Sequence, residues 1–105
     1  MTERMEKLKS YLVNSPHDSF LKHALALEYI KVGQDLDAKQ LFEDILQSDP
    51  GYIGSYYHLG KLLVRTGEPV SAIAWYEKGL NASKAAGDMH AHNELRGALD
   101  ELADL

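Results

Sequence analysis

The sequence predicts an all-α fold, a helical-hairpin repeat array of the α-solenoid type with about six helices. Three observations lead to this fold class: an internal repeat, apolar residues at helical spacing, and glycine and proline residues that recur at the repeat distance. A shift by one repeat places Leu25 on Leu59 and Gly33 on Gly67. In arrays of this kind each hairpin covers the apolar face of its neighbour.

The first predicted helix covers residues 2–14. Its apolar residues Leu8, Tyr11 and Leu12 occupy positions that are apolar again one repeat later, in the second helix of the next hairpin. We therefore interpret residues 1–16 as an N-terminal half-repeat, the second helix of a hairpin whose first helix is absent.

Two complete hairpins follow, repeat 1 over residues 19–52 and repeat 2 over residues 53–86. Gly33 and Gly67 end the first helix of each hairpin, because glycine accepts the positive φ that is common just past a helix C-terminus. On either side of them the apolar spacing is helical. The residues expected to form the apolar faces are Leu21, Leu25, Tyr29 and Val32, then Leu36, Leu41, Phe42, Ile45 and Leu46, then Ile53, Tyr56, Leu59 and Leu63, then Val70, Ile73, Tyr76 and Leu80.

A last helix is predicted over residues 88–105. Gly87 reads as the stop of the preceding helix and Asp88 as an N-cap. We interpret this helix as a cap that covers repeat 2, with a dimerisation helix as the alternative, and expect one domain over residues 1–105. Its apolar side consists of Ala91, Leu95, Leu99 and Leu102.

Composition excludes several classes of protein. The chain has 105 residues, with 11 Lys plus Arg against 16 Asp plus Glu, and its net charge of −5 argues against a nucleic-acid partner, which requires a basic surface. The absence of Cys rules out disulfides and thiolate chemistry. No apolar run reaches the roughly 18 residues of a membrane helix, and no secretory signal is present. We therefore expect no membrane partner and a cytoplasmic location.

No motif indicates catalysis or a cofactor. The chain lacks a glycine-rich phosphate loop and a GxSxG nucleophile turn. The five His residues show no metal-ligand spacing, and His90 and His92 point to different faces of one helix. We expect neither enzymatic activity nor a bound metal or cofactor.

The two hairpins resemble tetratricopeptide repeats. The matching residues are Leu25, Ala26, Tyr29, Gly33, Ala38, Phe42 and Pro50 in repeat 1, and Tyr56, Leu59, Gly60, Ala72, Tyr76 and Gly79 in repeat 2. Four positions depart from the family pattern: Lys22 stands where the opening aromatic would be, Ile45 replaces a small residue, Leu63 replaces a tyrosine, and Lys84 replaces the closing proline. The resemblance implies that small residues let the helices approach closely, and that the array binds a protein partner.

The resemblance also implies that the first helix of each hairpin lines a concave face. Tyr57, Lys61 and Arg65 are spaced by four residues and share one side of a helix. An aromatic ring beside two cations suits a peptide with an acidic or carboxylate group. For Phe20 and Leu27 we favour core packing over partner contact. The candidate partner-binding residues are Phe20, His23, Leu27, Lys31, Tyr57, Lys61 and Arg65.

The function predicted from the sequence is therefore a protein–protein interaction module. It would bind a peptide or helix of a partner in the concave groove. The alternative is a self-assembling structural unit that forms homo-oligomers through its end helices.

Overall fold

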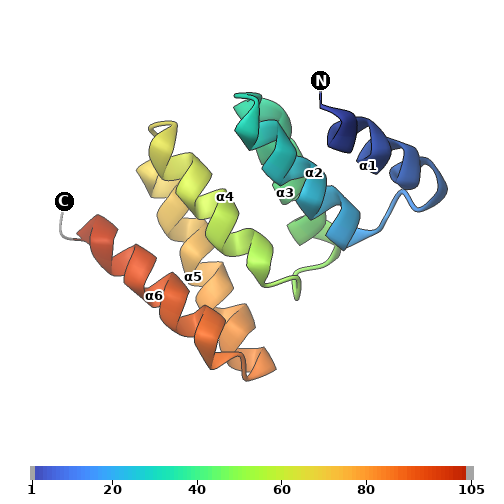
Figure 1. The fold of residues 1–105 in the computed structure, drawn as a ribbon. Helices are drawn as coiled ribbons and strands as arrows, with labels where there is room; N and C mark the ends of the chain where they lie inside the picture. The colour runs from blue at the N-terminus through green and yellow to red at the C-terminus, as the bar shows by residue number, and fades with distance from the viewer. Residues whose placement is uncertain (1, 104–105) are drawn as a thin grey trace. The chain divides into compact units, whose positions relative to one another are not determined.

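A computed structural model describes residues 2–103, and these residues form six α-helices with no strand among them (Figure 1). The all-α prediction and the expected number of helices are confirmed; residue 1 and residues 104–105 of the predicted domain lie outside the described residues. The helices are α1 (Glu3–Asn14), α2 (Ser19–Lys31), α3 (Asp35–Ser48), α4 (Gly54–Arg65), α5 (Pro69–Ala86) and α6 (Met89–Ala103).

The chain divides into two compact units between Asp49 and Pro50. Unit 1 holds α1 to α3, and in it α2 packs against both α1 and α3. Unit 2 holds α4 to α6, and in it α5 packs against both α4 and α6. The single domain over residues 1–105 stays a prediction, and each unit is described below by itself.

Short polar side chains begin three of the helices. The Oγ1 of Thr2 and the Oδ1 of Asp18 accept hydrogen bonds from the backbone N–H groups of Met5 and Leu21, each at 3.0 Å. Asp88 does the same at the start of α6, where its Oδ1 lies 3.0 Å from the nitrogen of Ala91. Such N-caps satisfy N–H groups that have no partner within the helix. The predicted N-cap at Asp88 is thus confirmed.

Glycines end α2, α4 and α5 in a left-handed conformation. Gly33, Gly67 and Gly87 have φ values of 78°, 84° and 71°. The next residue in each case donates its N–H back into the last turn of the helix, as in the bond of 2.8 Å from Glu68 to the carbonyl of Leu63. This pattern closes the helix and reverses the chain direction.

In unit 1 the buried cluster that joins α1 to α2 contains a residue that the apolar pattern did not single out. Met5 is fully buried and packs with Leu8, Ala24 and Leu25. At the other end of the hairpin, the Ser19 hydroxyl donates to the Asp49 carboxylate at 2.8 Å and so ties the start of α2 to the end of α3. The remaining buried apolar residues of this unit are Ala26, Ala38, Phe42, Ile45 and Leu46.

In unit 2 two glycines allow the helices to lie close together. A Cβ at Gly60 would overlap the ring of Tyr76, which is almost fully buried. A Cβ at Gly79 would lie 2.7 Å from the Cβ of Tyr56 and 2.9 Å from Cδ1 of Leu95. These contacts agree with the expectation that small residues at these two positions let the helices approach closely. The other buried apolar residues of this unit are Leu59, Leu62, Leu63, Ala72, Leu80 and Ala98.

Several residues that the sequence assigned to apolar faces are instead exposed. Leu36 and Val70 are 82% and 81% exposed, and Tyr11 and Val32 are also largely open to solvent. Leu36 and Val70 are each the second residue of a helix. Helical spacing shows toward which side of the helix such a side chain points. It does not show whether a neighbouring helix extends far enough to cover the first turn. The packing role favoured for Phe20 is also wrong, since its side chain is 65% exposed.

Candidate functional site

The face of α4 in unit 2 presents an aromatic ring beside two cations. Tyr57 is half-buried, whereas Lys61 and Arg65, one and two turns further along, are exposed. The Nζ of Lys61 lies 6.0 Å from the centre of the Tyr57 ring, within the range of a cation–π contact. Arg65 is in the last turn of α4, where a positive charge complements the helix dipole. We call these three residues the α4 face.

A neutral histidine lies next to the α4 face. The ring of His58 meets that of Tyr57 edge-on, with 5.7 Å between the ring centres. Burial lowers the pKa of His58 below its ordinary value, and the nearby carboxylate of Glu94 opposes this effect. His58 therefore favours its neutral form near pH 7, and the positive charge of the face comes from Lys61 and Arg65.

The buried phenol of Tyr76 lies under α4 and stays protonated. Burial raises the pKa of Tyr76 to about 12, and the charges of Tyr57 and Glu101 act in the same direction. Its ring fills the space left by Gly60, so it supports α4 from below. The α4 face therefore lies on a helix that packs against a buried and uncharged ring.

The candidates on α2 in unit 1 fall into two kinds. Phe20 projects into solvent near the start of the helix, and Leu27 is half-buried. The ring of His23 instead packs edge-on against Phe42, with 5.5 Å between the ring centres. Because Phe42 is fully buried, this contact gives His23 a packing role in the hairpin.

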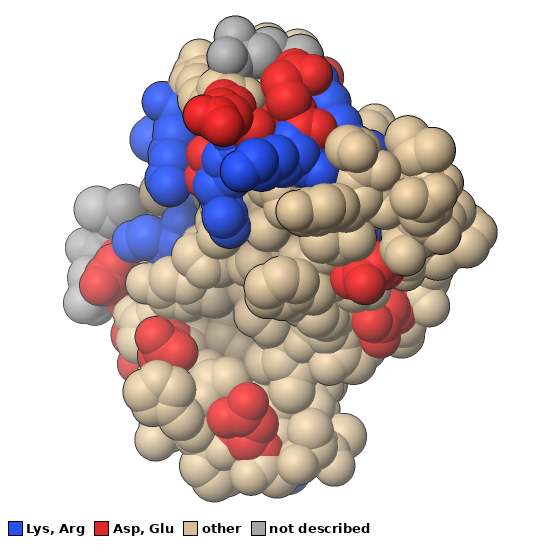
Figure 2. Space-filling view, turned by 45° about the vertical axis from the view of Figure 1, so that its right-hand side comes forward, with Lys and Arg blue, Asp and Glu red and all other residues tan. Residues whose placement is uncertain are grey.

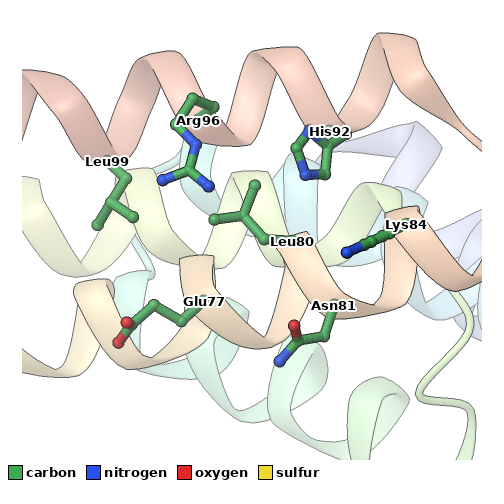
Figure 3. Close-up of a pocket in the computed structure, with 7 residues that line it drawn as sticks. All are labelled: Glu77, Leu80, Asn81, Lys84, His92, Arg96 and Leu99. Carbon is green, nitrogen blue, oxygen red and sulfur yellow. The ribbon is translucent and has the colours of Figure 1, made fainter.

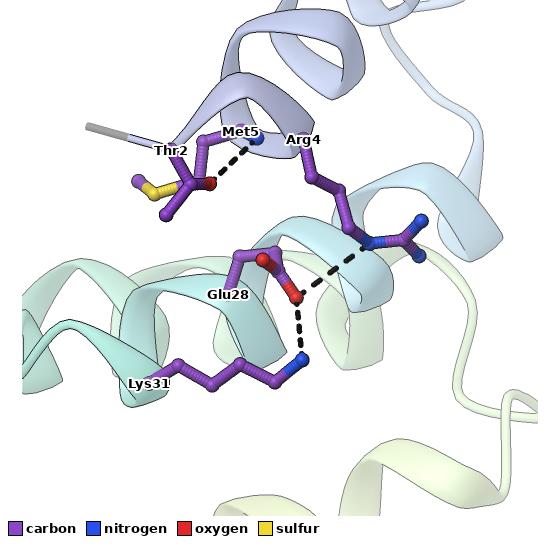
Figure 4. A network of polar contacts seen from close by, with 5 residues as sticks. All are labelled: Thr2, Arg4, Met5, Glu28 and Lys31. Atoms are coloured by element: carbon purple, nitrogen blue, oxygen red, sulfur yellow. Dashed lines mark hydrogen bonds and ion pairs between the residues drawn. The ribbon is translucent and has the colours of Figure 1, made fainter.

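Lys31, the fourth candidate on α2, is already engaged by a carboxylate (Figure 4). Its Nζ lies 3.0 Å from Oε2 of Glu28, and the Nε of Arg4 in α1 lies 3.5 Å from the same oxygen. Glu28 is buried, so two cations compensate one desolvated charge. A partner group would have to compete with Glu28 for Lys31.

Charges of both signs are mixed on the surface. On the face drawn in Figure 2, Lys and Arg side chains lie next to Asp and Glu side chains, and much of the remaining surface is uncharged. Among residues 2–103, no three His, Asp or Glu side chains form a group that could hold a metal ion. None of the helices described is long and apolar enough to cross a bilayer.

One feature of unit 2 was missed by the sequence analysis. A cavity of about 320 Å³ opens between α5 and α6, and basic side chains from both helices line it, including Lys84 and Arg96. Two features of the sequence could have indicated this cavity. Lys84 stands where the family resemblance places a proline, and His92 and Arg96 are four residues apart, on one side of a helix.

Solved structures similar to this chain decide its family. A tetratricopeptide repeat domain protein from Salinibacter ruber, known from a crystal structure, is 36% identical with a TM-score of 0.80, over 84% of this chain and 98% of that chain. The chain belongs to the tetratricopeptide-repeat family. A solution structure of a tetratricopeptide repeat domain protein from the same organism gives 37% identity and a TM-score of 0.82, over 86% of this chain and 91% of that chain.

A solution structure from Bordetella parapertussis extends the likeness over 99% of this tetratricopeptide-repeat chain and 90% of the other, with 29% identity and a TM-score of 0.83. No family model matches the sequence, and no curated protein matches it. Tetratricopeptide repeats are helical scaffolds that generally mediate protein–protein interactions, and fold alone does not name the partner.

Proposed function

We propose that this tetratricopeptide-repeat chain is a protein-interaction module that binds a short peptide or helix of a partner on the first helices of its hairpins, α2 and α4. The observation that carries the proposal is the α4 face, where the ring of Tyr57 and the ammonium group of Lys61 lie 6.0 Å apart on an exposed side of the helix. The proposal assigns no catalytic step to the chain.

The chemistry of the α4 face favours an acidic segment or a C-terminal carboxylate. The guanidinium group of Arg65 matches the geometry of a carboxylate, and the ammonium group of Lys61 adds a second positive charge one turn away. The ring of Tyr57 offers apolar area at a low cost in conformational entropy. Since the chain carries a net charge of −5, these cations also define where an acidic segment can approach.

The α2 residues of unit 1 differ in what they could contribute to binding a partner. Phe20 has an exposed ring and is the natural apolar contact of unit 1. Leu27 offers a smaller, half-buried surface. His23 is packed against Phe42 and Lys31 is paired with Glu28, so we assign these two a secondary role.

The test is affinity capture from a native lysate with a double charge reversal, Lys61→Glu with Arg65→Glu. We expect the captured partner to be lost, because both cations of the α4 face become repulsive to a carboxylate. The thermal melt should fall only slightly, since both side chains are exposed and a surface charge near a helix end contributes little to stability.

The matched control is Lys7→Glu with Lys78→Glu, which makes the same change in net charge at exposed positions of α1 and α5, outside the α4 face and the candidate residues of α2. The control should retain the partner. A partner that still binds the Lys61/Arg65 variant would contradict the assignment of the α4 face.

A further inference from the structure

The cavity between α5 and α6 lies outside the proposed interaction faces and has its own chemistry. It belongs entirely to unit 2, and its side chains come from two facing helices: Leu80 and Lys84 from α5, and His92, Arg96 and Leu99 from α6 (Figure 3). Its volume of about 320 Å³ is several times the roughly 30 Å³ share of a liquid water molecule, so it has room for a small organic group.

Two cations of the cavity have no anionic partner among residues 2–103. Neither Lys84 nor Arg96 forms an ion pair with any described residue. In Figure 3 the Lys84 side chain extends under His92, and the guanidinium group of Arg96 hangs from α6 toward α5. Two unpaired positive charges on facing helices favour an anion placed between them.

The imidazole of His92 adds an unsatisfied polar atom. Its Nδ1 is buried and has no hydrogen-bond partner among the described residues. An imidazole ring carries a hydrogen on at least one of its two nitrogens. His92 can therefore offer a hydrogen bond to a ligand in the cavity.

Two leucines supply the apolar part of the wall, and the amide of Asn81 also lines the cavity. Leu80 is only 8% exposed, and Leu99 is half-buried on the opposite helix. An inorganic anion would leave the open part of Leu99 in contact with water. A carboxylate that carries a small branched aliphatic group would cover it and gain a modest hydrophobic free energy.

We propose that this cavity binds a carboxylate attached to a small aliphatic body. Lys84, Arg96 and the His92 ring would hold the carboxylate, and Leu80 and Leu99 would contact the aliphatic part. Glu77 also lines the cavity, and in Figure 3 it lies at the end away from Lys84, where its negative charge opposes an anion. The site shares no residue with the α4 face, so it does not depend on the proposed function.

The test is a titration followed by backbone amide chemical shifts in ¹H–¹⁵N spectra. The probe is 4-methylpentanoate, and its neutral counterpart is 4-methylpentanamide. We expect saturable shifts confined to α5 and α6 with the acid and none with the amide. Lys84→Gln with Arg96→Gln should weaken the acid about tenfold or more, since two charge-assisted hydrogen bonds are lost. Glu77→Gln should strengthen it about twofold or more, because a repulsive charge is removed.

Further arms separate the sources of such a carboxylate and exclude a general effect of charge. Acetyl-Ala-Ala-Leu with a free C-terminus represents the end of a protein chain. Tighter binding of this peptide than of 4-methylpentanoate indicates a protein terminus, and weaker binding indicates a free acid. Either order supports the site. Lys7→Gln with Lys78→Gln makes the same charge change outside the cavity and should leave the titration unchanged.

Three results would overturn the proposal. They are the absence of saturable shifts with both acids, equal shifts with the amide, and unchanged affinity in the Lys84/Arg96 variant. Inorganic phosphate that binds as tightly as 4-methylpentanoate would also overturn it, since the aliphatic part would then contribute nothing.

Discussion

Single glycines determine how closely the helices of unit 2 approach one another. Gly60 leaves the space that the ring of Tyr76 fills, and Gly79 sits against both Tyr56 and Leu95. Gly97 on α6 is different, because a Cβ there would meet no atom within 4 Å. The three residues are all helical glycines, yet only the first two are required by packing.

The contrast between Gly79 and Gly97 gives a paired prediction for stability. Gly79→Ala should lower the free energy of unfolding by about 1–3 kcal/mol, because overpacking outweighs the gain in helix propensity. Gly97→Ala should raise it by about 0.5–1 kcal/mol through propensity alone. Urea denaturation of both variants measures the difference. A stabilised Gly79 variant would show that α5 has room at this point.

The half-buried His58 predicts a dependence of stability on pH. Its pKa is lowered in the folded chain from the ordinary value of 6.5, so the unfolded chain binds the proton more readily. The contribution of His58 is therefore present above pH 6.5 and is lost as the pH falls below it. Thermal melts between about pH 7.5 and 5.5 should show this loss, and His58→Gln should reduce it.

His17 provides the control for this measurement, because its side chain is exposed and lies outside the helices. His17→Gln should leave the pH dependence as in the parent chain. If the His58→Gln variant and the parent chain lose the same amount of stability, His58 is not the cause of the pH dependence.

At the scale of elements, α1 is held to unit 1 by two buried side chains, Met5 and Leu8, and by an ion pair of Arg4 with α2. Met5 lies in the cluster with Ala24 and Leu25, and Arg4 reaches Glu28 of α2 at 3.5 Å. Arg4 is well exposed, so the pair contributes modestly by itself. Most of the attachment of α1 therefore comes from apolar contacts such as those of Met5.

The docking of α1 can be tested with two truncations on the same helix. Met5→Ala should cost about 2–5 kcal/mol and speed amide hydrogen exchange throughout α1, because it opens a cavity beneath the helix. Val13→Ala is the matched control, since Val13 is 80% exposed and should change little. Equal protection of α1 in the two variants would mean that Met5 does not hold it.

The sequence predicted the order and the limits of the helices because a few residues encode them locally. Gly33, Gly67 and Asp88 each act through their own backbone or a bond to a neighbour a few positions away. Leu36 could not be placed in the same way, since its exposure depends on where an adjacent helix ends. The partner-binding roles of the α2 and α4 residues stay predictions.

The cavity between α5 and α6 required the structure for a similar reason. Lys84 and Arg96 belong to different helices, and only the packing of those helices brings them to one hollow. Sequence spacing relates side chains on one helix, whereas a site built from two helices depends on their mutual rotation. That rotation is set by contacts such as the one between Gly79 and Leu95.

For the whole molecule, the chain is expected to be a monomer. Leu95, on the apolar side of α6, is 1% exposed within its own unit, and a net charge of −5 opposes the approach of identical copies. The exposed apolar side chains include Val13, Leu36 and Val70, and scattered residues of this kind are normal on a soluble surface.

Sedimentation equilibrium tests this expectation directly. The measured mass at neutral pH should stay near 11.7 kDa as the protein concentration is raised. A mass that grows with concentration would favour the alternative function predicted from the sequence, a self-assembling unit. The same measurement with Leu36→Lys and Val70→Lys would then show whether those exposed side chains form the contact.

The left-handed glycines at the ends of α2 and α4 carry one more consequence. At Gly33 and Gly67 an added Cβ would meet nothing within 4 Å, so the positive φ is what disfavours L-amino acids at these two positions. A mirror-image residue has the opposite preference. Chemical synthesis with D-alanine at Gly33 and Gly67 should therefore yield a chain that loses less conformational freedom on folding.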